Sequence, residues 1–146
     1  MDSFLKESIQ LAESSLISGG FPVGAIICAD GVEVGRGTSS TQVLNDLTAH
    51  AEVQAIRAAM QRSKGGILYS SLEPCMMCLA ACAWAGIKQV VFACARSVVD
   101  PIYYESSATV AELSQVLVVP IKIVPDLVRQ DEVIALIRRW ETVCNQ

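Results

Sequence analysis

The sequence lacks three features that would assign it to a broad class of proteins. No apolar run reaches about 18 residues, so no membrane-spanning helix is expected. No basic segment followed by an apolar one begins the chain, so no signal peptide is visible and a cytoplasmic location is expected. Basic residues are too few, 11 against 15 acidic ones, for a broad surface that binds nucleic acid.

Histidine is almost absent, whereas cysteine is plentiful. His50 is the only histidine, and there are six cysteines. In a reducing compartment an even number of cysteines does not indicate a disulfide framework. Cys28 and Cys94 lie within apolar runs and are expected to be small core residues. Cys75 and Cys78 differ from these, because their spacing has chemical meaning.

The pattern of apolar residues predicts an α/β fold in one domain, residues 1–146. A hairpin turn at residues 30–31 makes the first two strands antiparallel. Helices and strands alternate in the second half, which favours a layered sandwich with parallel pairing there. Helices are expected over residues 2–18, 49–63, 75–85, 109–114 and 128–142, and strands over residues 23–29, 32–37, 67–70 and 89–93. Residues 116–124 are expected to contain a last strand.

A candidate metal site arises at the starts of two predicted helices. His50 begins one of them, and Cys75 and Cys78 begin another, directly after a proline. Two cysteines three residues apart share one helix face, so both thiolates can reach one ion. Zinc takes both cysteine sulfur and histidine nitrogen. Three protein ligands leave a fourth position open for water, as in catalytic sites, and zinc lowers the pKa of that water toward roughly 7.

Other interpretations of these residues stay open at this point. A Cys-x-x-Cys pair can be a redox pair or half of a structural zinc site, with Cys82 or Cys94 as a fourth ligand. A lone histidine is more often a packing residue than a ligand. Glu52, in the first turn of its helix, could simply complement the helix dipole. The joint pattern favours a catalytic zinc site over each of these alternatives.

The two motifs together resemble those of a known family. His-Ala-Glu at residues 50–52, with Pro-Cys-Met-Met-Cys at residues 74–78, is similar to the signature of zinc-dependent cytidine and nucleobase deaminases. The likeness covers roughly residues 3–142 and looks closest to the branch of guanine deaminases, free-base cytosine deaminases and tRNA adenosine deaminases. It implies a three-layer α/β/α sandwich around a five-stranded mixed sheet, one zinc ion per chain and a homodimer.

The resemblance also implies roles for individual residues. Glu52 would take a proton from the zinc-bound water, protonate a ring nitrogen and deliver a proton to the departing amine. Backbone groups of Ala51 and Glu73 would contact the substrate and the leaving ammonia. Ser39 stands where the similar enzymes have an asparagine that holds the base, so this chain departs from their pattern there.

Three further residues are candidates for substrate contact. Trp84 resembles a tryptophan that lies near the base in guanine deaminases, and its alternative is packing in the core of its helix. Phe21, just before the first strand, could stack on a ring or pack internally. Asp100 falls in the loop over residues 94–107, and such a loop over a strand end often lines or covers a site.

Three functions are compatible with these features. The favoured one is hydrolytic deamination of a free nucleobase or related amino-heterocycle, of guanine or cytosine type, with release of ammonia. The acidic balance and the departure at Ser39 favour this small substrate and disfavour nucleic acid. The second function is tRNA adenosine deamination, and the third is that of a non-catalytic zinc-binding partner subunit.

Overall fold

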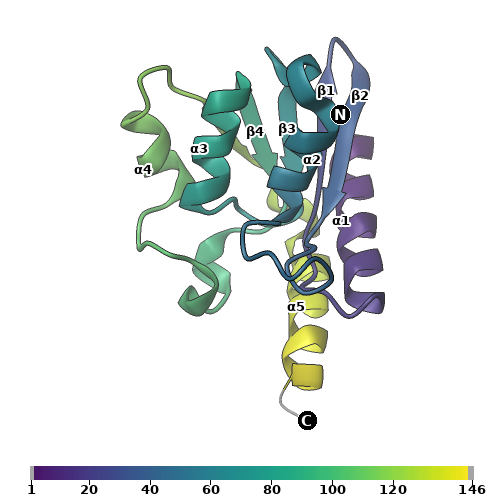
Figure 1. Cartoon of the computed structure of the whole chain (residues 1–146). Coiled ribbons are helices and arrows are strands. Elements are labelled where there is room, and N and C mark those ends of the chain that lie inside the picture. Colours follow the sequence, from purple (N-terminus) through teal and green to yellow (C-terminus); the bar gives the residue numbers. More distant parts are fainter. Residues whose placement is uncertain (1, 145–146) are drawn as a thin grey trace.

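A computed structural model describes residues 2–144 (Figure 1). The short apolar runs form strands, and the amphipathic segments between them form helices. The helices are α1 (Asp2–Ile17), α2 (Ala51–Ala59), α3 (Met76–Ala85), α4 (Val110–Gln115) and α5 (Gln130–Cys144). The strands are β1 (Gly24–Ala29), β2 (Val32–Thr38), β3 (Ile67–Ser70), β4 (Gln89–Phe92) and β5 (Lys122–Pro125).

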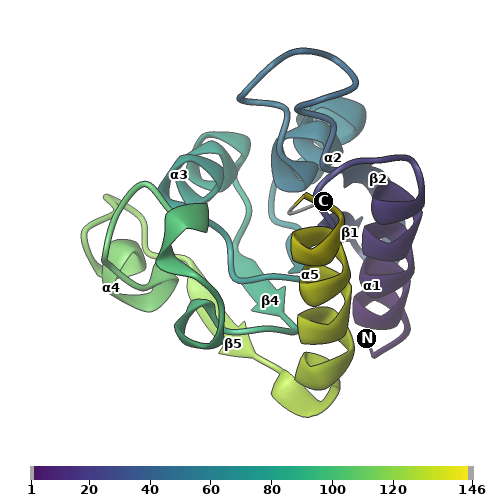
Figure 2. The same ribbon diagram turned by 90° about the horizontal axis from the view of Figure 1, so that it is seen from below.

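The strands form one mixed sheet in the order β2-β1-β3-β4-β5. Strand β1 pairs antiparallel with both β2 and β3, whereas β3, β4 and β5 run parallel. Helices α1 and α5 lie side by side on one face of the sheet, and α2, α3 and α4 cover the other (Figure 2). The five-stranded mixed sheet and the α/β fold predicted from the sequence are therefore confirmed.

The last strand lies at the end of the range that was predicted to contain it. Strand β5 begins at Lys122, so only the last three of residues 116–124 belong to it. The valine-rich segment before it is an exposed loop, in which the Val118 side chain is fully solvent-exposed. Ser114 closes this loop, because its hydroxyl accepts a hydrogen bond from the Ile121 N–H at 2.9 Å and donates one to the Ile121 carbonyl oxygen. Among residues 2–144 no helix has the length and apolar character needed to cross a membrane.

Glycine in β2 brings α2 close to the sheet. A Cβ atom added to Gly37 would lie 2.5 Å from the Ala51 carbonyl oxygen, which is closer than real side chains approach. Gly35 makes a similarly close approach one turn further along α2, to the backbone of Ala55 and Ala59. The first turn of α2 is therefore held directly against β2, and this fixes where His50 and Glu52 stand.

Candidate active site

The candidate site lies at the end of the sheet where β3 and β4 terminate. In parallel sheets, ligands bind outside the carboxyl ends of the strands. His50 is the residue immediately before α2, and Cys75 is the residue immediately before α3. The N-termini of two helices therefore meet at this end of the sheet, and each brings a positive partial charge that favours anionic ligands.

His50, Cys75 and Cys78 bring three potential metal-binding atoms together. The His50 Nδ1 atom lies 3.6 Å from the Cys75 sulfur and 3.5 Å from the Cys78 sulfur. A tetrahedral zinc with Zn–N near 2.0–2.1 Å and Zn–S near 2.3 Å places nitrogen and sulfur about 3.6 Å apart. All three ligand atoms lie within 4.8 Å of one another. Donor chemistry and spacing therefore both fit zinc.

The chain prepares Cys75 as an anionic ligand. A hydrogen bond with Cys78 and one with His50 lower the pKa of the Cys75 thiol to about 5, although burial acts in the opposite direction. Thiolate, and not thiol, is the form that binds zinc. The metal ligands are thus preorganised by contacts within the protein.

The remaining cysteines stand apart from this cluster. Within the part of the chain that the structure describes, the only group of three or more potential ligands is His50, Cys75 and Cys78. Cys82 and Cys94 are buried and lie outside it, so a fourth cysteine ligand is not supported. The expected open zinc position fits this three-ligand set.

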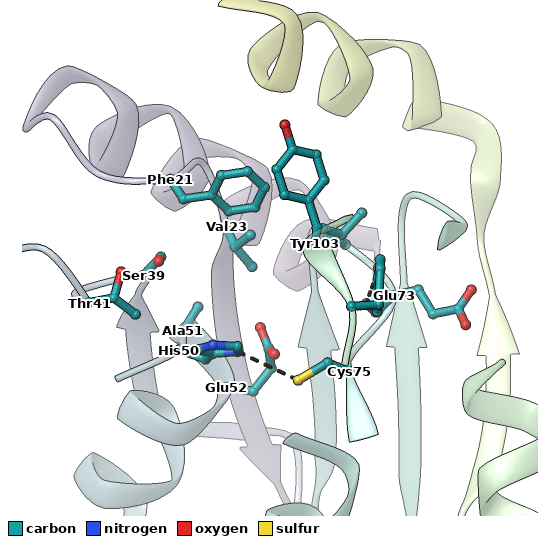
Figure 3. Close-up of a pocket in the computed structure, with 12 residues that line it drawn as sticks. Phe21, Val23, Ser39, Thr41, His50, Ala51, Glu52, Glu73, Cys75 and Tyr103 are labelled. Atoms are coloured by element: carbon teal, nitrogen blue, oxygen red, sulfur yellow. Dashed lines mark hydrogen bonds between the residues drawn. The ribbon is translucent and has the colours of Figure 1, made fainter. Parts of the chain in front are cut away.

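Glu52 is buried beside the ligands, with its side chain directed into the site (Figure 3). Its Oε1 atom accepts a hydrogen bond from the Ser70 hydroxyl at 3.3 Å. Burial raises the pKa of Glu52, while a hydrogen bond with Cys78 acts in the opposite direction. A carboxyl group with a raised pKa is a stronger proton acceptor than an ordinary one, which suits a general base. The interpretation of Glu52 as a mere complement to the helix dipole leaves this burial unexplained.

A cavity of about 200 Å³ opens onto these residues. Figure 3 shows Phe21 and Tyr103 on the opposite side of it from His50, with the Tyr103 hydroxyl directed away. That hydroxyl donates to the Glu141 carboxylate of α5 at 2.7 Å. The lining residues are Phe21, Val23, Ser39, Thr41, His50, Ala51, Glu52, Leu72, Glu73, Cys75, Tyr103 and Tyr104. The rings of Phe21 and Tyr103 thus lie across the cavity from the candidate zinc ligands and Glu52.

Comparison with protein families assigns the part of the chain that carries this site. The model of the cytidine and deoxycytidylate deaminase zinc-binding region matches residues 1–94, more than half of the 146 residues. The chain belongs to this deaminase family. The match includes all three clustered ligands, so the expected cofactor, zinc, is confirmed as the metal of the family to which this site belongs.

Individual relatives fall in two branches of the family. The chain is 43% identical over 98 residues to guanine deaminase of Bacillus subtilis, covering 63% of each protein. It is 42% identical over 76 residues to a tRNA-specific adenosine deaminase of Agrobacterium fabrum, covering 49% of this chain and 50% of that one. The alignments thus span between half and two thirds of these relatives.

A solved structure extends the likeness of the fold. It comes from a study of A-to-I editing by tRNA:A34 deaminases and superposes with a TM-score of 0.72 at 28% identity. The superposition covers 86% of this chain and 98% of that one. The recognition of a zinc-dependent deaminase from its two short motifs is therefore confirmed, and guanine deaminase and tRNA adenosine deaminase, two of the three kinds of enzyme suggested, are among the similar proteins.

Glu73 lies in the site with its backbone toward the cavity and its carboxylate directed away (Figure 3). The carboxylate accepts hydrogen bonds from the Arg96 N–H at 3.1 Å and the Val110 N–H at 2.9 Å. Both donors belong to the segment that follows β4. The Glu73 side chain therefore anchors this segment over the deaminase site, and only its backbone is placed for substrate contact.

Ser39, Ala51 and Phe21 all line the cavity, as expected. Ser39 is buried, and among residues 2–144 its hydroxyl has no protein hydrogen-bond partner. Ala51 is the first residue of α2, so its backbone N–H has no partner within the helix. The ring of Phe21 lies 4.7 Å from that of Tyr103. Phe21 thus both packs on an aromatic neighbour and faces the cavity.

Trp84 and Asp100 are placed elsewhere. Trp84 is 92% exposed on α3 and does not line the cavity, so the alternative of helix-core packing is wrong and contact with substrate inside one chain is not supported. Asp100 also lies outside the lining, because its carboxylate accepts the Ile102 N–H at 2.9 Å and caps the turn Pro101–Tyr103. Neither residue lines the cavity of the described chain, and their contact with substrate stays a prediction.

Glu105, in the loop over residues 94–107, has a role that the sequence does not indicate. Its carboxylate accepts hydrogen bonds from the Met76 and Met77 N–H groups, each at 3.2 Å, and so caps α3 next to Cys75. Desolvation opposes ionisation, but hydrogen bonds from backbone N–H groups lower the pKa of Glu105. The partner segment is 28 residues further along the chain, so no local capping pattern could indicate it.

Proposed function

We propose that the protein is a hydrolytic deaminase that removes the exocyclic amino group of a free nucleobase or related amino-heterocycle, of guanine or cytosine type. The observation that carries this proposal is the buried Glu52 beside the ligand cluster at the floor of a small cavity. At about 200 Å³, the cavity is below the roughly 300–1,000 Å³ of sites for drug-sized ligands. A single heterocyclic ring system suits such a volume.

The chain's own residues supply binding and proton transfer. His50, Cys75 and Cys78 would hold the zinc ion, which would supply a water of lowered pKa. Glu52 accepts one proton of the attacking water and transfers it to a ring nitrogen. It then accepts the second proton, from the hydroxyl now on the ring carbon, and delivers it to the amine, which leaves as ammonia while the carbonyl forms. Phe21 and Tyr103 supply flat apolar surface for the ring. The Ser39 hydroxyl, the Ala51 N–H and the Glu73 carbonyl are the polar groups that orient it.

The tRNA adenosine deaminases among the similar proteins support a second candidate function. Such an enzyme needs a basic surface for phosphates, and this chain has a formal charge of −4. Four of its surface arginines pair with acidic side chains, which reduces their use for phosphate. The ion pairs join Arg36 to Glu7 and Glu33, Arg57 to Asp46, Arg129 to Glu132 and Arg139 to Glu13. The free base therefore stays the favoured substrate.

A screen for ammonia release distinguishes the candidate functions. Zinc-loaded protein is incubated with guanine, cytosine, isocytosine and adenine, and separately with tRNA, whose adenosine-to-inosine conversion is measured. We expect release of ammonia from at least one base and no inosine. Inosine formation that falls steeply with salt would favour the second function. Bound zinc without product from any compound would indicate the non-catalytic partner subunit.

We also propose a homodimer that buries the outer face of α3. This helix contains no charged residue, although Met76, Ala80, Ala83 and Trp84 on its outer face are exposed. The Ser63 hydroxyl donates to the Ala85 carbonyl at 3.0 Å, which ties the neighbouring turn Met60–Ser63 to the end of α3. The Met60 side chain on that turn is 68% exposed. A wholly apolar helix is typically buried, and a second copy would bury this one.

Trp84→Glu tests the dimer. Loss of a central tryptophan typically costs 2 kcal/mol or more, so we expect the dimer dissociation constant to rise by at least about 30-fold in analytical ultracentrifugation. Val128→Glu is the matched control, because Val128 is also 92% exposed but lies outside this face. A monomeric wild-type protein, or a Trp84→Glu dimer as tight as the control, would contradict the proposal.

The cytoplasmic location and the single-domain extent stay predictions.

A further inference from the structure

Tyr104 lines the cavity and contacts the chain segment that leads into the metal ligands. Its hydroxyl donates a hydrogen bond to the Glu73 carbonyl oxygen at 2.7 Å. Glu73 precedes Cys75 by two residues, and both line the same cavity as Tyr104. Two oxygen atoms from distant parts of the chain thus stand side by side next to the site where hydrolysis is proposed.

The hydrogen bond fixes what each oxygen can offer to a ligand. A phenolic hydroxyl has one proton, and here that proton is committed to the Glu73 carbonyl. Burial raises the pKa of Tyr104, so the hydroxyl keeps its proton at neutral pH. The Tyr104 oxygen is therefore left as an acceptor. The Glu73 carbonyl has a second lone pair and is an acceptor as well.

The position of Tyr104 is tightly held. The Arg96 guanidinium lies 4.2 Å from the centre of the Tyr104 ring. Arg96 itself donates to the carbonyl oxygens of Ser106 and Ala108, each at 2.6 Å. Its backbone N–H is bound by the Glu73 carboxylate. Arg96 thus contacts both Tyr104 and Glu73, and it holds their two oxygen acceptors in a fixed relative position. Such preorganisation reduces the entropy lost on ligand binding.

We infer that the Tyr104 hydroxyl and the Glu73 carbonyl together form a two-acceptor site for the amino group that the enzyme removes. The two oxygens lie only 2.7 Å apart, so one N–H of a primary amino group can be shared between them in a three-centre hydrogen bond, whereas a ring without that group satisfies neither. Tyr104 is then a specificity-determining residue that discriminates amino-bearing rings from those that lack the amino group. The inference rests on the proposed base deaminase activity.

Tyr104→Phe tests the inference by separating the amino group from the ring. In steady-state assays, kcat/KM is measured for guanine, and the inhibition constant is measured for hypoxanthine, which lacks only the amino group. If cytosine is the base that is deaminated, the pair is cytosine and pyrimidin-2-one. Loss of one neutral hydrogen bond predicts a decrease in kcat/KM of about 3- to 10-fold. The inhibition constant of the ring without the amino group is expected to stay within about 2-fold of the wild-type value.

Tyr69→Phe is the matched control, because it removes a tyrosine hydroxyl from β3 outside the cavity lining. We expect it to change neither quantity. Equal weakening of both ligands by Tyr104→Phe would mean that Tyr104 only shapes the cavity, and an unchanged kcat/KM would mean that its hydroxyl does not contact the amino group. Either result overturns the inference while the base deaminase activity stands. Absence of ammonia from every base would instead contradict the proposed function itself.

Discussion

Glu52→Gln is expected to retain one zinc per chain and to lose about 10²- to 10⁴-fold in turnover, the usual contribution of a positioned general acid–base. Glutamine has nearly the same size and can still accept the Ser70 hydrogen bond, so the fold and the ligand cluster are preserved. It cannot accept and return a proton. Since Glu52 is buried, bulk water has little access to replace it in that task.

The measurement combines initial rates of ammonia release with zinc content by atomic absorption. Glu13→Gln is the control, because Glu13 is an exposed residue of α1 that lies outside the cavity lining and forms a 4.0 Å ion pair with Arg139. The control is expected to keep both activity and zinc. Wild-type turnover in Glu52→Gln would remove Glu52 from the mechanism. Loss of zinc together with activity would show that Glu52 supports the metal site instead.

The ligand cluster could be predicted from the sequence because its geometry is mostly local. Cys75 and Cys78 share the first turn of one helix, and His50 and Glu52 share the first turn of another. Only the contact between the N-termini of α2 and α3 depends on tertiary structure. The alternation of strands and helices makes that meeting predictable, since parallel neighbouring strands bring both helix starts to the same end of the sheet.

The residues around the substrate are predicted less well, because loops place them. Asp100 lies in a suitable loop, but a local hydrogen bond commits its carboxylate to capping a turn. Trp84 lies on the ligand-bearing helix, but two turns beyond Cys78, where the helix surface faces outward. Tyr104 reaches the Glu73 carbonyl across 31 residues. Such contacts depend on the path of the whole segment between β4 and α4, for which no sequence periodicity exists.

The segment before β5 illustrates a different limit. Its run of valines has high strand propensity, yet the chain there forms a loop closed by Ser114. Strand pairing needs a free neighbour, and β4 offers only four paired positions to β5, from Gln89 to Phe92. The register of the sheet therefore overrides the local preference of residues that lie before Lys122.

Cys78→Ala is expected to abolish zinc binding, whereas Cys82→Ala is expected to retain one zinc per chain. The two cysteines lie one turn apart on α3 and both are fully buried, so the substitutions create similar losses of packing. Only Cys78 has its sulfur 3.5 Å from His50 Nδ1. Its removal leaves two ligands, which is too few for a stable protein site for zinc.

The stability readout separates metal binding from packing. Wild type and Cys82→Ala should gain about 4 kcal/mol in free energy of unfolding when free zinc exceeds its dissociation constant 1,000-fold, and Cys78→Ala should gain nothing. Metal content and urea denaturation with and without a chelator provide both quantities. Zinc lost from Cys82→Ala but kept by Cys78→Ala would make Cys82 the ligand. Zinc lost from both would mean a closed four-ligand shell, which leaves no position for water and excludes hydrolysis at this site.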